Sequence, residues 1–416
     1  MTTTLASPLA LPCGATIPNR LCKAALTEGL ADPLNRATER HERLYRAWSQ
    51  GGAGLVITGN VQIDRRYLER PGNVVIDGAA TGDDDGLEAL RRYAAAGTVG
   101  GNHLWMQLNH PGRQTPTHVC PEPVAPSAVP LLNHSAAQFA PPRALREDEI
   151  EDVIRRWARA AGVAREAGFT GIQVHAAHGY LLSQFLSPVA NRRTDGWGGG
   201  LAERARLLRE VVRACRRAVG AGFPIGVKLN SSDFQQGGFS ADDCLQVVRW
   251  LGEDGVDLLE LSGGSYESPT MMGAKLRGPD AERPAAESTR RREAYFLEYA
   301  AAMRGAAAMP VMVTGGFRTR AAMDEALSAG ELDMVGLGRP MCVDTDLPRR
   351  LLSGECAQAV AYERDIDPPK AGLAWFCLQL IRIGDGLEPD RGLDGATAMA
   401  RYAENEARTA RGLVGR

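Results

Sequence analysis

The amino-acid sequence predicts a (β/α)8 barrel, and two observations lead to that prediction. Short apolar runs alternate with amphipathic stretches of helical period along most of the 416 residues. Eight such pairs can be marked, and a barrel of this kind needs about 250 residues, or more with insertions. A doubly wound open sheet is the alternative, because periodicity does not show whether a sheet closes. The sequence contains no G-x-G-x-x-G or G-x-x-x-x-G-K-[ST] motif, so we expect no Rossmann or P-loop nucleotide site.

The predicted elements follow one another in strict order, a strand and then a helix, eight times. Each strand is a short apolar run, and each helix shows apolar residues at a helical period. The predicted strands span residues 21–26, 54–58, 104–108, 171–174, 225–229, 258–261, 311–314 and 334–337. The predicted helices span residues 38–50, 87–96, 147–167, 201–219, 241–253, 291–303, 318–329 and 346–352.

Two segments exceed what the barrel needs. Residues 109–146 form a long, proline-rich loop after the third strand, and loops of that length commonly serve as lids or substrate walls. Residues 357–416 follow the eighth unit and contain an apolar stretch at 373–381. We expect a barrel domain over 1–356 and a C-terminal extension over 357–416. The extension would pack on the barrel or at a subunit interface of a homo-oligomer; an active-site wall is the alternative.

Composition and charge exclude several classes of function. The formal net charge is −2 and no run is rich in lysine or arginine, which argues against a nucleic-acid or anionic-membrane partner. No apolar run approaches the roughly 20 residues of a membrane span, and the N-terminus lacks the features of a signal peptide. The eight cysteines include no C-x-x-C pair, as expected in a reducing compartment. These observations predict a soluble, cytoplasmic protein.

The fourth predicted strand ends in a cluster of polar side chains. His175, His178 and Tyr180 follow residues 171–174, and catalytic groups of barrel enzymes lie at this end of the strands. The histidines could be metal ligands, buried structural groups, or paired donors to a substrate oxygen. A metal would want further ligands from other strand ends, and no H-x-H or H-E-x-x-H motif accompanies the pair. We therefore favour paired donors, with Tyr180 beside them and no metal.

Glycines and an arginine follow the seventh and eighth predicted strands. Gly315 and Gly316 come after residues 311–314, and Gly338 and Arg339 come after residues 334–337. Backbone N–H groups can approach a phosphate closely at such glycines, and a guanidinium supplies a fork of donors. In a barrel, the loops after strands seven and eight frequently form a phosphate site. The spacing therefore favours phosphate binding over simple tight turns.

Taken together, the motifs resemble those of the old yellow enzyme family, the FMN-dependent ene-reductases also called NADH:flavin oxidoreductases. The resemblance covers roughly residues 5–355. It is carried by Asn19-Arg20-Leu21 with Ala24 to Thr27, by the run QLNHPGR at 107–113, by residues 175–199, and by Gly315-Gly316 with Gly338-Arg339. The residues around Lys228 and 261–267 resemble one bacterial and fungal subgroup.

The resemblance implies one non-covalently bound FMN and a set of residues around it. Ala25 and Thr27 would line the flavin, and Gly59 and Gln107 would touch its polar edge. Gly315, Gly316, Gly338 and Arg339 would hold the phosphate. Lys228, where many relatives have arginine, would lie near N1 and the C2 carbonyl. It is one of four lysines beside 44 arginines, so it is a specific choice, although a lysine that only pairs with a carboxylate such as Asp233 is the alternative.

The resemblance also implies the reaction. NAD(P)H would reduce the flavin, leave, and be replaced on the same face by a small activated alkene. His175 and His178 would bind the substrate carbonyl oxygen, and Tyr180 would protonate the α carbon. The alternatives are a flavin-dependent biosynthetic isomerase or oxidase and a metal-dependent barrel hydrolase. The cysteine cluster and two further domains of the dienoyl-CoA reductase branch are missing, which argues against a long acyl-CoA substrate. Glu28 is expected to be a capping or solvated group, as is Asp233.

Overall fold

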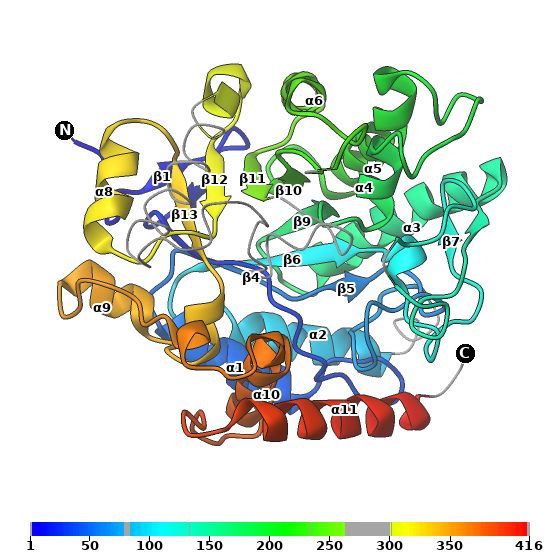
Figure 1. The fold of residues 1–416 in the computed structure, drawn as a ribbon. Helices are drawn as coiled ribbons and strands as arrows, with labels where there is room; N and C mark the ends of the chain where they lie inside the picture. Colours follow the sequence, from blue (N-terminus) through cyan, green and yellow to red (C-terminus); the bar gives the residue numbers. More distant parts are fainter. Residues whose placement is uncertain are drawn as a thin grey trace.

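The computed structural model describes residues 2–78, 84–132, 134–233, 235–262, 300 and 302–413, and these form a closed barrel of eight parallel strands surrounded by helices (Figure 1). The strands are hydrogen-bonded in sequence order, and β13 pairs with β3 to close the ring. The barrel prediction is confirmed. The barrel strands are β3 (Leu21–Lys23), β4 (Leu55–Ile57), β6 (His103–Asn109), β9 (Gly171–Ala176), β10 (Ile225–Asn230), β11 (Leu258–Ser262), β12 (Val311–Thr314) and β13 (Met334–Leu337).

Helices cover the outside of the barrel at nearly the predicted positions. The predicted helix 291–303 lies largely outside the described residues. Within the described residues, α4 (Leu181–Leu186), which directly follows the histidine cluster, and α11 (Gly395–Gly412) are helices that were not predicted. The helices that follow barrel strands are α1 (Glu39–Gln50), α2 (Asp84–Ala96), α3 (Glu147–Glu166), α5 (Leu201–Val219), α6 (Ala241–Glu253), α8 (Arg320–Ser328) and α9 (Leu347–Ser353).

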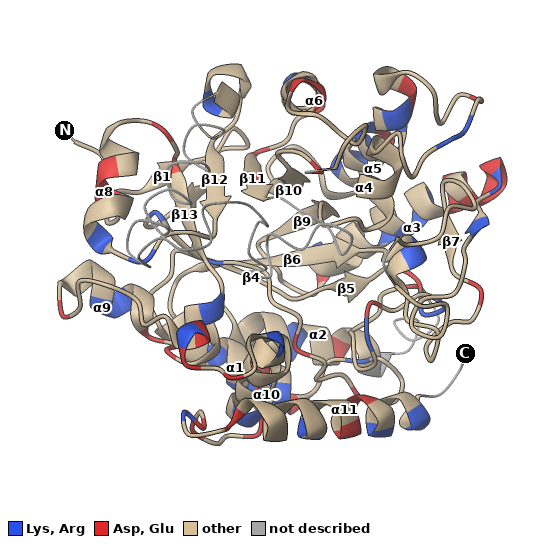
Figure 2. Ribbon diagram, viewed as in Figure 1, with Lys and Arg blue, Asp and Glu red and all other residues tan. Residues whose placement is uncertain are grey.

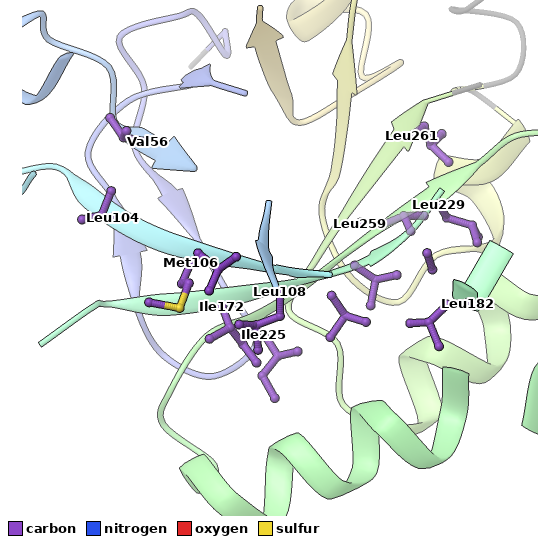
Figure 3. Packing of buried hydrophobic residues seen from close by; sticks show 14 of the residues in the cluster. Val56, Leu104, Met106, Leu108, Ile172, Leu182, Ile225, Leu229, Leu259 and Leu261 are labelled. Atoms are coloured by element: carbon purple, nitrogen blue, oxygen red, sulfur yellow. The ribbon is translucent and has the colours of Figure 1, made fainter. Parts of the chain in front are cut away.

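Strand alternation divides the apolar residues into an outer and an inner set. Side chains such as Leu104, Met106, Ile172 and Leu259 point outward and pack beneath the helices (Figure 3). The inner set includes Trp105, and it fills the barrel near the amino ends of the strands. A hairpin of β1 (Leu9–Ala10) and β2 (Thr16–Ile17) adds its apolar side chains to this inner set. The amino end of the barrel is therefore a packed apolar floor.

Charged side chains lie mainly on the helices and loops, with both signs mixed, while the strands carry few of them (Figure 2). Lys23, Lys228 and Glu260 are exceptions, because all three lie on barrel strands and are buried. Ions buried in this way need partners. Lys23 points outward, where its ammonium donates to the Ile57 carbonyl at 2.7 Å and lies 3.8 Å from the centroid of the Trp48 ring.

The C-terminal extension packs beside the first helix of the barrel. Its apolar stretch forms α10 (Gly372–Gly384), which contacts α1, and α11 packs on α10 (Figure 1). Arg43 Nε donates to the Gly384 carbonyl at 2.7 Å. The role of the extension at a subunit interface stays a prediction. None of the described helices combines the length and apolar character that crossing a lipid bilayer requires.

Candidate active site

The turn after β9 brings the predicted catalytic side chains together. The His175 ring lies 5.1 Å from the His178 ring and 4.8 Å from the Tyr180 ring, centroid to centroid, and both contacts are edge-on. All three side chains are buried. His178 adopts a left-handed backbone conformation with φ of 61°, which is uncommon for a residue other than glycine and recurs at functional sites. This turn lets two imidazoles and a phenol converge.

Hydrogen bonds determine what each imidazole can offer. His175 Nδ1 accepts from the Ala177 N–H at 3.2 Å, so the neutral ring carries its proton on Nε2. No described residue accepts from that Nε2–H. His178 Nε2 forms a 2.7 Å hydrogen bond with the Ser262 hydroxyl, which can donate and leave Nδ1–H as the donor of the ring. The His178 backbone N–H donates to Asn230 Oδ1 at 3.1 Å, which holds the turn.

Both imidazoles are held in the neutral form. Burial is the main cause: it lowers the pKa of His175 and of His178 well below the usual value for histidine, and the Lys228 ammonium lowers both further. A neutral imidazole with one N–H is a hydrogen-bond donor over the physiological pH range. The site can therefore stabilise a developing oxyanion without a change in its own charge.

Four polar side chains form a row across the interior of the barrel, one layer above the apolar floor, and two hydrogen bonds and one ion pair join them. Gln107 Nε2 donates to Gln173 Oε1 at 2.7 Å, and Gln173 Nε2 donates to Glu260 Oε2 at 2.7 Å. Lys228 Nζ lies 2.9 Å from Glu260 Oε1, an ion pair that lacks the alignment of a hydrogen bond. We call Gln107, Gln173, Glu260 and Lys228 the interior row.

Lys228 does pair with a carboxylate, but its partner is Glu260, so Asp233 was the wrong partner to name. Lys228 and Glu260 are direct partners in the parallel register of β10 and β11, which places both side chains on the inner face. Asp233 lies beyond the end of β10, where it accepts from the Ser187 hydroxyl at 2.5 Å and from the Phe239 N–H at 3.0 Å. It is buried and bonded rather than solvated.

The residues expected around the flavin lie where β3 and β4 end. Thr27 Oγ1 donates to Glu69 Oε2 at 2.8 Å, and Ala25 borders the apolar floor. The Gly59 N–H donates to Glu28 Oε1 at 3.1 Å, and a Cβ at Gly59 would lie 2.1 Å from Glu28 Oε2. Only glycine fits there. Glu28 is buried and also accepts from the Tyr45 hydroxyl, so it is not the solvated group that was expected.

The predicted phosphate site lies at the ends of β12 and β13, next to β3 in the ring. Gly315 and Gly316 have φ of 106° and 85°, a backbone conformation that favours glycine, and Gly338 begins the turn after β13. The Arg339 guanidinium is partly exposed, and its Nη1 lies 4.0 Å from Glu363 Oε1. Burial would raise the pKa of Glu363, but Arg318, 2.5 Å away, and Arg339 hold it below the usual range.

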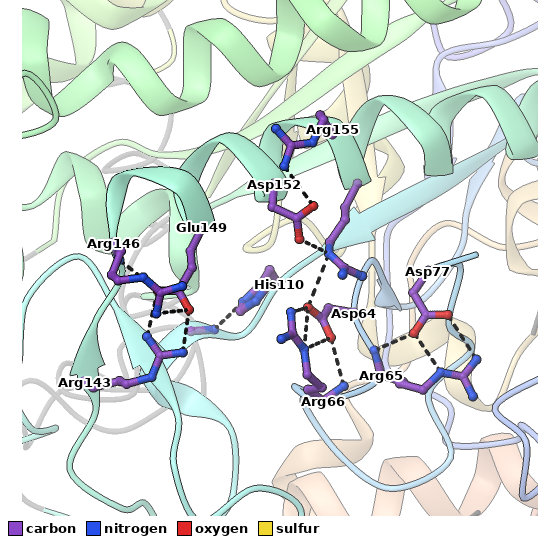
Figure 4. Close-up of polar contacts among 12 residues, drawn as sticks. Asp64, Arg65, Arg66, Asp77, His110, Arg143, Arg146, Glu149, Asp152 and Arg155 are labelled. Atoms are coloured by element: carbon purple, nitrogen blue, oxygen red, sulfur yellow. Dashed lines mark hydrogen bonds and ion pairs between the residues drawn. The ribbon is translucent and has the colours of Figure 1, made fainter. Parts of the chain in front are cut away.

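The long loop after β6 is held against α3 and borders the mouth of the barrel. Arg143, within this loop, forms an ion pair with Glu149 of α3 at 2.7 Å (Figure 4). Gln114, within this loop, donates from Nε2 to the His178 carbonyl at 3.1 Å. The loop thus contacts the turn that carries the predicted catalytic side chains, and its role as a substrate wall stays a prediction.

Several residues of the site were not predicted from the sequence, chief among them Gln173, Glu69 and Ser262. Gln173 could have been found, because it precedes His175 by two residues and so lies on the same face of β9. Among the described residues, no group of three or more His, Cys, Asp or Glu side chains is placed to hold a metal ion.

The described residues fit a bound flavin mononucleotide. Gln107 Oε1 has no donor among the described residues, so it is available to a polar ring edge. The glycine turns and Arg339 suit a phosphate. A closed barrel with these two features defines a class, the flavin-dependent barrel oxidoreductases.

The comparison with known families makes that class specific. The model of the NADH:flavin oxidoreductase / NADH oxidase family matches residues 5–358, and the chain belongs to that family. It is an FMN- and NAD(P)H-dependent oxidoreductase of the old yellow enzyme type.

Individual relatives agree with this assignment. The chain is 41% identical to the NADH-dependent flavin oxidoreductase iliE of Neonectria sp. (strain DH2). The match covers 82% of this chain and 46% of that protein, so the chain spans about half the length of this relative. It is 37% identical to the NADH-dependent flavin oxidoreductase iccE of Talaromyces variabilis, over 84% of this chain and 86% of that one. The solved old yellow enzyme homologue from Zymomonas mobilis superposes with a TM-score of 0.68 at 27% identity, covering 86% and 94% of the two chains.

Proposed function

We propose that this protein reduces the C=C bond of α,β-unsaturated carbonyl compounds at the expense of NAD(P)H. The observation that supports this substrate class is the convergence of two neutral imidazoles and the Tyr180 phenol in one turn. Such a set can bind a carbonyl oxygen with two donors while a third group supplies a proton nearby. A bound FMN would supply the hydride chemistry, from NAD(P)H to the β carbon of the substrate.

The residues of the turn divide the work on the substrate. His175 Nε2–H and the donor of His178 bind the carbonyl oxygen and stabilise the negative charge that develops there. Removing one such donor raises the activation free energy by about 3 kcal/mol in comparable sites. Tyr180 gives its phenolic proton to the α carbon. The two histidines thus act on the carbonyl oxygen, where the negative charge develops, and Tyr180 acts on the carbon that is protonated.

The remaining predicted residues would hold the cofactor. Gly315, Gly316, Gly338 and Arg339 would bind its phosphate. Gln107, Gly59, Ala25 and Thr27 would meet the ring, and Lys228 would lie near its anionic N1–C2 region when reduced. Arg339→Ala should reduce FMN affinity by roughly 10- to 100-fold, because a hydrogen bond to a charged group contributes about 1.5–3 kcal/mol. Fluorescence titration of the apoprotein with FMN measures this.

Anaerobic half-reactions test the proposal directly. The purified protein should be yellow, NADH or NADPH should bleach it, and a simple cyclic enone should restore the colour with the saturated ketone as product. A yellow protein that converts an unsaturated substrate without consuming NAD(P)H would instead be an isomerase. A folded native protein that takes up no flavin would refute the assignment of the site.

A further inference from the structure

The interior row has a fixed direction of hydrogen bonding, and Glu260 determines it. An ionised carboxylate can only accept, so Gln173 must turn its Nε2 toward Glu260 at 2.7 Å. The Gln173 oxygen then faces Gln107 and accepts from its Nε2, also at 2.7 Å. The Gln107 oxygen therefore points away from Gln173, and Gln107 keeps this oxygen and its second Nε2–H for the site. The Glu260 carboxylate therefore determines, through Gln173, that the oxygen of the Gln107 amide group points toward the site.

The same carboxylate also balances a charge. Glu260 is fully buried and Lys228 nearly so, with 2.9 Å between Oε1 and Nζ. Breaking a buried pair of this kind by removing one partner leaves an uncompensated ion. The field that Lys228 exerts above the row is consequently reduced by an anion on the neighbouring strand.

We propose that Glu260 is a positioning residue for the flavin: it lowers the midpoint potential by offsetting Lys228 and orients Gln107 as an acceptor for a ring N–H. The proposal rests on the proposed placement of Lys228 and Gln107 against the ring. Glu260 itself touches neither the substrate nor the cofactor and acts through its two neighbours.

A purely structural role for Glu260 predicts something different. If the row only stabilised the barrel, its loss would lower stability and leave the potential of bound FMN unchanged. If the row sets the charge beneath the ring, Glu260→Gln should raise the potential, because the Lys228 ammonium is then unopposed beside the reduced, anionic flavin. The sign of the change separates the two roles.

The test is a redox titration of the FMN-loaded variants. Glu260→Gln should shift the oxidised-to-reduced ratio at least tenfold toward the reduced form, which is about 30 mV for a two-electron couple. Lys228→Met should shift it in the opposite direction. The double variant Glu260→Gln/Lys228→Met should lie between the two single variants, close to the wild type, because it removes both charges.

Two further variants control for folding. Asp257→Asn removes a carboxylate that is also buried and ion-paired, to Arg216 at 2.5 Å, but just before the amino end of β11. Its midpoint potential should equal that of the wild type. Gln173→Met keeps every charge but breaks the hydrogen-bonded chain, so it should weaken FMN binding about tenfold while moving the potential less than Glu260→Gln does.

The outcomes are distinct. An unchanged or lowered potential in FMN-bound Glu260→Gln overturns the inference, and so does an equal shift in Asp257→Asn. If Glu260→Gln does not fold, unchanged FMN affinity in Gln173→Met overturns the orienting role, and an unchanged potential in Lys228→Met overturns the charge role. Failure of the wild type to bind FMN would instead refute the proposed function.

Discussion

The two ends of the barrel interior are built from the same strands but do different things. On β6, Trp105 lies in the apolar floor, and the next inward residue, Gln107, belongs to the interior row. On β11, Leu258 lies in the floor and Glu260 in the row. On each strand the floor residue and the row residue are two positions apart, which is a distance of roughly 6–7 Å along the strand. The same strand thus fixes the position of its polar residue by burying the apolar one below it.

Burial alone does not distinguish the apolar core of the barrel from the candidate site. Trp105 and Glu260 are both fully buried, yet one belongs to an apolar cluster and the other to a hydrogen-bonded network. A substitution at the floor should therefore change stability, and one at the carboxyl end should change the chemistry.

Tyr180→Phe should slow the reaction with an enone by roughly 10²- to 10⁴-fold, the usual contribution of a general acid. Reduction of the bound flavin by NAD(P)H needs no proton from Tyr180 and should keep its rate. Stopped-flow absorbance of the two half-reactions measures both. An equal loss of rate in the two half-reactions would show that Tyr180 serves packing and not proton transfer.

His175→Ala should slow enone reduction by about 10²- to 10³-fold, as expected when one donor to a developing oxyanion is lost. It should also weaken the binding of a phenol, whose oxygen mimics that of an enolate, and leave FMN bound. Spectral titration with a para-substituted phenol gives the affinity. Since Ser262 occupies Nε2 of His178, Ser262→Ala should affect phenol binding less than His175→Ala. The reverse order would show that His178 is the main donor.

Leu258→Ala should lower the free energy of unfolding by about 2–5 kcal/mol, because it leaves a cavity in the floor. The rate constants of the folded variant should stay within about twofold of the wild type, since Leu258 lies at the amino end of β11 and the histidine turn lies at the opposite end of the barrel. Chemical denaturation and the same stopped-flow assay give the two numbers. A large change in rate at full FMN occupancy would mean that the floor and the row are not separate.

The smallest expected effect is a pH dependence of stability from His41, outside the barrel. Burial is the main cause that lowers its pKa to about 3. In the unfolded chain the pKa of His41 is near 6.5, so the unfolded chain binds the proton more readily than the folded chain does. The contribution of neutral His41 to the free energy of unfolding is therefore complete above about pH 6.5 and is lost as the pH falls. Between pH 6.5 and 5 the loss is about 1.5 kcal/mol. His41→Gln should lose that much less between the two pH values in urea denaturation; an identical loss would contradict this account.

Much of the architecture was readable from the sequence because it depends on local patterns. The apolar runs at 311–314 and 334–337 coincide with β12 and β13, since a buried parallel strand needs little more than such a run. The first strand is shorter than predicted and ends at Lys23.

The candidate site was readable only in part. His175, His178 and Tyr180 lie within six residues, so their convergence follows from one turn. The pairing of Lys228 with Glu260 joins residues 32 positions apart and depends on the register between β10 and β11. Register is a property of the closed sheet rather than of either segment, so the nearby Asp233 was the wrong partner.

The hairpin of β1 and β2 has a practical consequence for attaching the molecule to a surface. It covers the closed end of the barrel, and the N–H of Leu5, just ahead of it, is anchored by a 3.0 Å hydrogen bond to Asp324. A linker joined at the N-terminus would immobilise the enzyme by that closed end and leave the open end facing the solution. On an electrode or a bead, this orientation would keep small molecules free to enter and leave, whereas a linker after α11 would bring the support toward the segment of Glu69 and Arg70, which pairs with Glu406.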